Sequence, residues 1–172
     1  MGEWNLKSFG IIQEAGDIFK TINSMLFMRD NYVLVGIPQK ETTREGEEIT
    51  NAELLFIHTN GSPVNNIPAR PVIEPAIKYN KDRISEMLRK SAQAFIDGSR
   101  IKAYEQLERV GIYAQNICRG WFTNPNNGWP PNSPSVIKAK MKKGATEPRP
   151  LIDTGELRKS ITYVIVKDGE EQ

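Results

Sequence analysis

The stretch Tyr32-Val33-Leu34-Val35-Gly36-Ile37 decides the fold class of this chain. Its β-branched and aromatic side chains favour a pleated, at least half-buried strand, and Pro38, which has no backbone N–H to donate, ends the strand. A second run of the same kind, Ile161-Thr162-Tyr163-Val164-Ile165-Val166, lies near the other end of the sequence. The two runs predict strands in a chain whose other patterned segments are helical.

Helical periodicity precedes the first strand and fills the middle of the chain. Apolar residues recur at helical spacing from Phe9 to Leu26 and form one stripe, with Asp17 and Lys20 on the water side. The same spacing runs through residues 84–121. Gly98 predicts a break there into two helices, with a single kinked helix as the alternative.

A capping box predicts one more helix between the strands. Thr50 is followed three residues later by Glu53, so a short helix is expected over residues 51–59, with Asn60-Gly61 as its stop. Strands do not alternate regularly with helices, so nothing demands a parallel sheet. The predicted fold class is therefore α+β, with a small sheet packed by an N-terminal helix and long central helices.

Length and composition predict one domain, residues 1–172, that buries roughly two-thirds of the surface of its unfolded chain. Polar segments predict flexible loops at 39–49 and 123–149 and a short acidic tail at 167–172. The formal net charge of +2 is too small to indicate nucleic-acid binding. Cys118 is the only cysteine, which excludes an intrachain disulfide and fits a reducing cytoplasm. No secretory leader and no apolar run of about 20 residues is visible, so we expect a soluble chain with no membrane partner.

The motif Ile67-Pro68-Ala69-Arg70-Pro71 predicts a rigid segment. Each proline fixes its own φ angle and biases the preceding residue toward extended backbone, so Arg70 is held with little freedom. A planar guanidinium in that position suits a carboxylate or a backbone carbonyl. The partner could lie in the same domain or in a neighbouring subunit, and the sequence leaves both open.

A second motif, Leu151-Ile152-Asp153-Thr154-Gly155-Glu156-Leu157, predicts the start of a helix. We expect Asp153 to cap the amides of the next turn while Glu156 reaches back, with Gly155 permitting close backbone approach. Leu151 and Leu157 would anchor the segment in the core. No acid, base or metal ligand accompanies Asp153 locally, so no catalytic residue, metal or cofactor is predicted here.

Three further groups have both a structural and a functional interpretation. His58, the only histidine, is expected to be a hydrogen-bonded packing residue rather than a ligand or base, and Cys118 to lie in the core. A basic patch could meet DNA phosphates or be a solvated loop, and it consists of Lys138, Lys140, Lys142, Lys143 and Arg149. Aromatic side chains that could anchor an interface or close the core are Trp121, Phe122 and Trp129.

Together the motifs resemble the tail-completion and virion-morphogenesis proteins of tailed bacteriophages, the neck proteins that join head to tail. The resemblance covers roughly the last two-thirds of the chain and differs from the family pattern at Thr59-Asn60, Val72 and Val136. The residues that carry it are His58-x-x-Gly61, Ile67–Pro71, Trp129-Pro130-Pro131-Asn132-Ser133-Pro134 and Leu151-Ile152-Asp153-Thr154-Gly155-x-Leu157-x-x-Ser160-Ile161.

This resemblance implies a mainly antiparallel sheet with helices, assembled as a homo-oligomeric ring, commonly of six copies, in the virion neck. Implied partners are the head connector or stopper protein and the tail terminator or tail tube protein, after synthesis in the host cytoplasm. We expect docking through Lys40–Glu48, Thr123–Pro134 and the acidic tail, with non-specific contact to genomic DNA left open. Two alternatives are a small DNA-binding module that uses Lys138–Arg149 and a hydrolase that uses His58 or Cys118.

Overall fold

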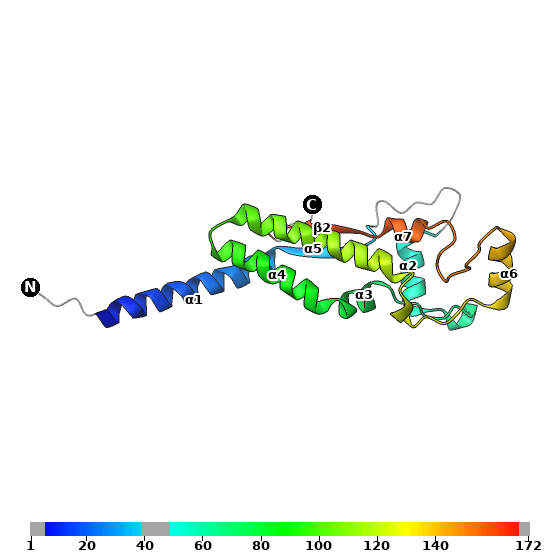
Figure 1. Cartoon of the computed structure of the whole chain (residues 1–172), viewed down its shortest axis with the longest axis horizontal. Helices are drawn as coiled ribbons and strands as arrows, with labels where there is room; N and C mark the ends of the chain where they lie inside the picture. The colour runs from blue at the N-terminus through cyan, green and yellow to red at the C-terminus, as the bar shows by residue number, and fades with distance from the viewer. Residues whose placement is uncertain (1–5, 39–48, 169–172) are drawn as a thin grey trace, which may run out of the picture.

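A computed structural model describes residues 6–38 and 49–168 and has the predicted α+β fold. A long helix and a strand come first, further helices follow, and a second strand ends the described chain (Figure 1). Among the described residues, two single-turn 3-10 helices lie in the connections, η2 at Pro63–Asn65 and η3 at Pro125–Asn127. The remaining elements are α1 Leu6–Asp30, β1 Tyr32–Gly36, α2 Asn51–Asn60, α3 Ile73–Tyr79, α4 Lys81–Ile96, α5 Arg100–Trp121, α6 Pro134–Lys142, α7 Glu156–Ser160 and β2 Thr162–Val166.

The sheet joins the two strand runs that the sequence predicts. β1 and β2 pair antiparallel, with Tyr32 opposite Val166 and Gly36 opposite Thr162. Both strands pack against α5, and α4 packs on α5 in turn (Figure 1). Close approach of α5 to β2 depends on Gly111, because a Cβ atom at this position would overlap the ring of Tyr163.

The core consists of two clusters along α5. One surrounds Phe27, whose ring stacks on Phe95 with centroids 4.3 Å apart. The other lies at the far end of α5, where Cys118 is fully buried as predicted. Buried side chains from α2, α3, α5 and α7 meet in this second cluster, and they include Leu55, Val72, Trp121, Phe122, Leu157 and Ile161.

Local signals set several helix boundaries as predicted. The capping box is present, because Thr50 Oγ1 accepts from Glu53 N at 3.2 Å and Thr50 N donates to the Glu53 carboxylate at 2.9 Å. Gly61 ends α2 with φ of 73° and donates its N–H to the Ile57 carbonyl at 2.7 Å. Gly98, with φ of 84°, separates α4 from α5, which confirms two helices rather than one kinked helix.

Three local predictions are wrong. Asp153 and Glu156 form no capping box: α7 begins at Glu156 after Gly155, which has φ of 81° and no side-chain cap. Gly155 also permits no close backbone approach, because a Cβ atom there would meet nothing within 4 Å, and its left-handed backbone is what favours glycine. Asp153 instead pairs with Lys143, with a nitrogen–oxygen distance of 3.5 Å. The loop predicted at 123–149 contains η3 and α6, because a serine cap and a proline in the first turn start a helix within an otherwise irregular segment.

Helix α1 differs from the predicted arrangement in the direction of its apolar stripe. Phe19, Ile22 and Leu26 lie at the surface, whereas Phe27 and Ser24 are buried against the body. No described helix is long and apolar enough to cross a membrane. The predicted loop at 39–49, apart from residue 49, lies outside the described residues, and so do residues 169–172 of the acidic tail.

Candidate functional site

The segment Ile67–Pro71 lies against the end of α2. Ser62 and Ile67 form a two-residue antiparallel bridge, with N–O distances of 2.8 and 2.9 Å. Arg70 N donates to the His58 carbonyl at 2.5 Å. A Cβ atom at Gly61 would come within 2.8 Å of Ala69 N, so only glycine allows this approach at that φ angle. The predicted rigidity therefore comes from the prolines and from this packing on α2.

Arg70, Pro71, Trp129, Pro130 and Pro131 form a reciprocal contact that we call the clasp. The Arg70 guanidinium donates to the Pro130 carbonyl from Nε at 3.2 Å and from Nη2 at 3.0 Å. Nη2 also donates to the Pro131 carbonyl at 3.1 Å. In return, Trp129 Nε1 donates to the Pro71 carbonyl at 2.9 Å. Each motif thus satisfies backbone oxygens of the other, which selects the same-domain partner for Arg70.

Burial makes the clasp a fixed part of the structure. Arg70 is only 7% exposed, and burial lowers the pKa of its guanidinium, although the charge persists at any ordinary pH. Phe122 and Trp129 meet edge to face at 5.7 Å, which joins the clasp to the core. Trp121 and Phe122 are buried, so these two aromatic side chains close the core rather than anchor an interface.

The motif Leu151–Leu157 is joined to the site by Lys140. This side chain, on α6, donates from Nζ to the Arg149 carbonyl at 2.8 Å and to the Ile152 carbonyl at 2.5 Å. Leu151 adopts a left-handed backbone with φ of 57° and faces the same space. Leu157 is buried against Leu55 in the core cluster, as predicted. Lys140 therefore holds the loop before α7 against α6.

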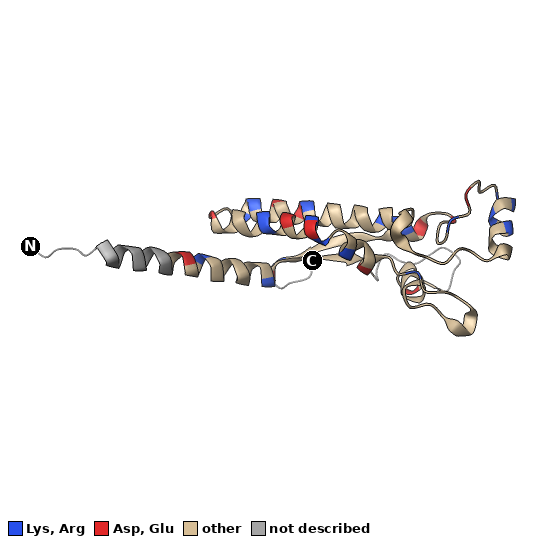
Figure 2. Ribbon diagram, turned by 60° about the horizontal axis from the view of Figure 1, so that its bottom comes forward, with Lys and Arg blue, Asp and Glu red and all other residues tan. Residues whose placement is uncertain are grey.

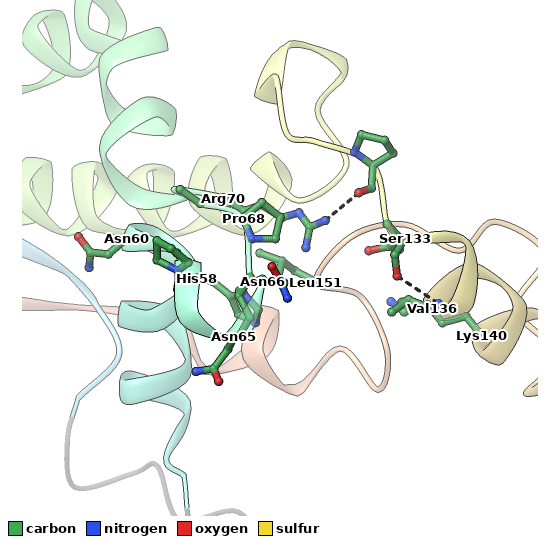
Figure 3. Close-up of a pocket in the computed structure, with 16 residues that line it drawn as sticks. His58, Asn60, Asn65, Asn66, Pro68, Arg70, Ser133, Val136, Lys140 and Leu151 are labelled. Carbon is green, nitrogen blue, oxygen red and sulfur yellow. Dashed lines mark hydrogen bonds between the residues drawn. The ribbon is translucent and has the colours of Figure 1, made fainter.

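An open groove of about 1120 Å³ lies between the three motifs, and we call it the clasp groove (Figure 3). The motifs are Ile67–Pro71, Trp129–Pro134 and the segment that begins at Leu151. The walls of the groove come from α2, the Ile67–Pro71 segment, α6 and the loop before α7. The lining is rich in amide and hydroxyl groups, with Arg70 and Lys140 as its cations, and the further polar side chains are His58, Asn60, Asn65, Asn66, Asn132 and Ser133.

Burial lowers the pKa values of two basic side chains in the clasp groove, His58 and Lys140. Burial first and the Arg70 charge second lower the pKa of His58, so its imidazole is neutral at neutral pH. Burial also lowers the pKa of Lys140, with Asp153 acting in the opposite direction. His58 Nδ1 is buried and has no hydrogen-bond partner among the described residues. Nδ1 therefore does not make the hydrogen bond expected of this ring, whereas the backbone carbonyl of His58 accepts from Arg70 N.

The described residues do not favour thiol chemistry at this site. Cys118 lies in the core rather than in the clasp groove, and burial raises the pKa of its thiol to about 12. A thiol with that pKa stays protonated near neutral pH and is a poor nucleophile. Within residues 6–38 and 49–168, no three His, Cys, Asp or Glu side chains are grouped to hold a metal ion.

The basic patch is partly neutralised by local contacts. Lys140 is held by two carbonyls, Lys143 pairs with Asp153, and Arg149 pairs with Glu147 at 2.6 Å. Lys138 and Lys142 make no ion pair with any other described residue. Figure 2 shows Lys and Arg residues along α6, at the end of the molecule opposite α1.

The predicted site residues thus divide into four groups. Ile67, Pro68, Ala69, Arg70, Pro131 and Leu151 line the clasp groove, while Pro71, Trp129 and Pro130 complete the clasp. Ile152 and Leu157 pack into the core, and Thr154 and Gly155 shape the start of α7. Asp153 stands apart from these groups and pairs with Lys143. Sequence reasoning missed the role of Lys140 as a loop anchor and that of Asn132, whose Nδ2 donates to the Pro148 carbonyl at 2.8 Å. The motif Trp129–Pro134 contains Asn132, and this was the sequence signal that could have indicated a structural role for its side chain.

Comparison of the chain with family models, with curated proteins and with solved structures found no match. The functional argument therefore depends on the motifs and on how the fold brings them together.

Proposed function

We propose that this protein is a structural component of the tailed-bacteriophage neck, forming a ring of six copies that completes the tail and joins it to the head connector. The observation that carries the proposal is the clasp. Motifs that resemble those of neck proteins, separated by about 60 residues, bind each other through Arg70 and Trp129. Residues whose main task is to position backbone segments suit a protein that presents surfaces to partners.

The shape of the molecule supports two separate contacts. α1 projects from one end of the body, and the clasp groove lies at the opposite end with α2, α6 and α7 (Figure 1). A neck protein has to contact a head-side and a tail-side partner at once. An elongated chain with distinct surfaces at its two ends suits that requirement, and a ring repeats both surfaces around an axis.

The clasp groove is the proposed contact for one neighbouring ring. Amide groups from asparagines line it, and Arg70 and Lys140 add positive charge, so a polypeptide segment with exposed carbonyls or carboxylates fits it chemically. Val136, an exposed apolar side chain on α6, adds an apolar contact. The partner would be the connector or stopper on the head side, or the terminator or tube on the tail side.

The docking elements expected from the sequence differ in how they relate to the fold. Within Thr123–Pro134, Pro130 and Pro131 accept hydrogen bonds from Arg70 and Trp129 packs on Phe122, so this segment is built into the fold. Deleting it would remove the clasp as well as any docking surface. The segment Lys40–Glu48 lies outside the described residues and stays a docking candidate on composition alone.

DNA binding receives less support than neck assembly. Three of the five cations in the basic patch are occupied by carbonyls or by carboxylates, which leaves Lys138 and Lys142 for phosphate contacts. Two phosphate contacts would give only a shallow salt dependence of binding. A filter-binding assay with randomised duplexes across a salt series measures this slope directly.

Electron microscopy of particles assembled without this protein tests the proposal. We expect filled heads and separate tails, and normally joined virions would contradict the neck assignment. Complementation with Val136→Arg should lower joining by at least about tenfold, the effect of a loss of about 1.4 kcal/mol in binding. Met141→Arg is the matched control, because Met141 is an exposed apolar residue of α6 outside the clasp groove.

A further inference from the structure

An apolar stripe on α1 lies uncovered on the surface of the protein. Phe19 is 66% exposed, and its neighbours at helical spacing are exposed as well. The members of this α1 stripe are Ile18, Phe19, Ile22, Met25 and Leu26. Their spacing of one, four, seven and eight residues from Ile18 is that of an amphipathic helix that lays one face into a groove.

The α1 stripe faces away from the body of its own chain. Phe27 and Ser24 are buried, and Phe27 stacks on Phe95 of α4. With about 3.6 residues per turn, the centre of the stripe lies roughly 140–160° around the helix axis from these two residues. Figure 1 and Figure 2 show that α1 projects beyond α4, and every member of the stripe is at least 42% exposed.

The base of α1 is joined to the body of the protein by the buried side chain of Asn31. Asn31 is 1% exposed, and its Nδ2 donates to the Phe27 carbonyl at 2.8 Å. Its Oδ1 accepts from the Tyr104 hydroxyl at 2.8 Å and from Asp168 N at 3.1 Å. These bonds tie the end of α1 to α5 and to the end of β2, and so set the direction of the helix.

The same chain carries an apolar cavity of about 330 Å³ between β1 and helices α3 and α4, which we call the β1 groove. Among the described residues that line it, only Asn31 and Tyr32 bring polar side-chain atoms. The size is at the lower end of the range of about 300–1,000 Å³ found for ligand pockets, so it suits a few large side chains. Its apolar walls include Val33, Val35, Ile73, Ile77, Ile84 and Leu88.

We propose that the α1 stripe of one copy docks in the β1 groove of a neighbouring copy, so that each copy donates a helix to the next. This inference rests on the proposed ring for its partner, and it names the two surfaces that would build the ring. A projecting helix and a groove on different parts of one chain form a heterologous contact, which closes into a ring when the rotation per copy permits.

A second copy is the occupant that the two surfaces favour. Stripe-on-stripe pairing would leave the apolar β1 groove open to water, whereas stripe-in-groove pairing covers both surfaces. The stripe contributes five large side chains, fewer than the roughly 20–30 residues a side of a standard interface. We therefore expect weak association of the isolated protein, strengthened when copies gather on a neighbouring ring.

Sedimentation of the purified full chain tests the two surfaces, with a concentration series extending to the order of 1 mM, where contacts with millimolar Kd are visible. We expect concentration-dependent association of the wild-type chain. Phe19→Glu removes the stripe. Ile84→Glu places a charge in the β1 groove at a half-buried position outside both buried core clusters. Each should weaken association at least about tenfold.

The matched control is Ile101→Glu, because Ile101 is 76% exposed on α5 and touches neither surface. An equimolar mixture of Phe19→Glu and Ile84→Glu gives the sharpest result. Each variant retains one intact surface, so the mixture should form one-to-one dimers and stop there. Circular dichroism of each variant reports whether it is folded. If Ile84→Glu does not fold, oxidative crosslinking of a Met25→Cys, Ile84→Cys chain replaces it, and a ladder of linked copies is expected.

Several outcomes would overturn the inference. They are a wild-type chain that stays monomeric throughout, an Ile84→Glu variant that associates like the wild type, and stripe-dependent binding to phosphatidylcholine vesicles without self-association. The absence of a ladder of linked copies from the Met25→Cys, Ile84→Cys chain would also overturn the inference. The neck assignment fails separately: if these surfaces associate as expected but virions lacking the protein are normally joined, the proposed function is wrong and the interface stands.

Discussion

Arg70 and Pro130, 60 residues apart in the sequence, are joined by two hydrogen bonds from one guanidinium to one carbonyl oxygen, at 3.2 and 3.0 Å. The Trp129 indole returns a bond to the carbonyl of Pro71. Prolines have no N–H to donate, but their carbonyls are full acceptors. The clasp uses this property to fasten two stiff segments without a regular sheet.

Arg70→Lys should lower the free energy of unfolding by about 1.5–3 kcal/mol, the range for hydrogen bonds to a charged group. Lysine keeps the charge but cannot reproduce the planar fork that reaches two carbonyls. Urea denaturation measures the change. Arg89→Lys is the control, because Arg89 is exposed on α4, and equal effects of the two substitutions would contradict a special role for the clasp.

Trp129→Phe should cost about 1–3 kcal/mol, since it leaves the Pro71 carbonyl without its donor while an aromatic ring can still pack on Phe122. If the clasp acts as one unit, the double variant with Arg70→Lys will be less destabilised than the sum of the two single variants. A coupling of about 0.5–3 kcal/mol is expected from residues that share a network. Strict additivity would show that the two sides are independent.

Gly111→Ala should destabilise the protein by about 1–3 kcal/mol, because its Cβ atom would overlap the Tyr163 ring in a packed layer. Gly120→Ala, in the same helix, meets nothing within 4 Å. Alanine there should stabilise α5 by up to about 1 kcal/mol through reduced chain entropy. Thermal unfolding of both variants checks the prediction, and two shifts of the same sign would refute it.

The unfolding free energy should depend on pH through His58. Burial and the Arg70 charge lower the pKa of its imidazole below the ordinary value of 6.5. The unfolded chain therefore binds a proton first as the pH falls, so the stabilisation is complete above pH 6.5 and is lost from there down through the folded-state pKa. His58→Gln should flatten the stability profile below pH 6.5. Urea denaturation at stepped pH values measures it, and an unchanged slope would contradict the assignment.

Local chemistry decided the elements that the sequence predicted. Thr50 and Glu53 meet within one helical turn, and Gly98 interrupts the helix through its own backbone freedom. Interactions of this kind join residues close in the sequence, so they can be predicted without knowing the path of the chain. The capping box expected at Asp153 did not form: α7 begins after Gly155, whose left-handed backbone separates Asp153 from the first turn, and Asp153 pairs with Lys143 instead.

The sequence by itself determined the α+β class, the two strands and the stiffness of the Ile67–Pro71 segment, because side-chain propensity and proline geometry act within a few residues. Only the tertiary structure decided that Arg70 holds Pro130 and that His58 and Lys140 share a groove. The tertiary structure also decided that the apolar stripe of α1 faces solvent, because Phe27 rather than the stripe packs on the body. Helical periodicity defines which residues share a face, but the partner of that face depends on packing between segments far apart in the chain.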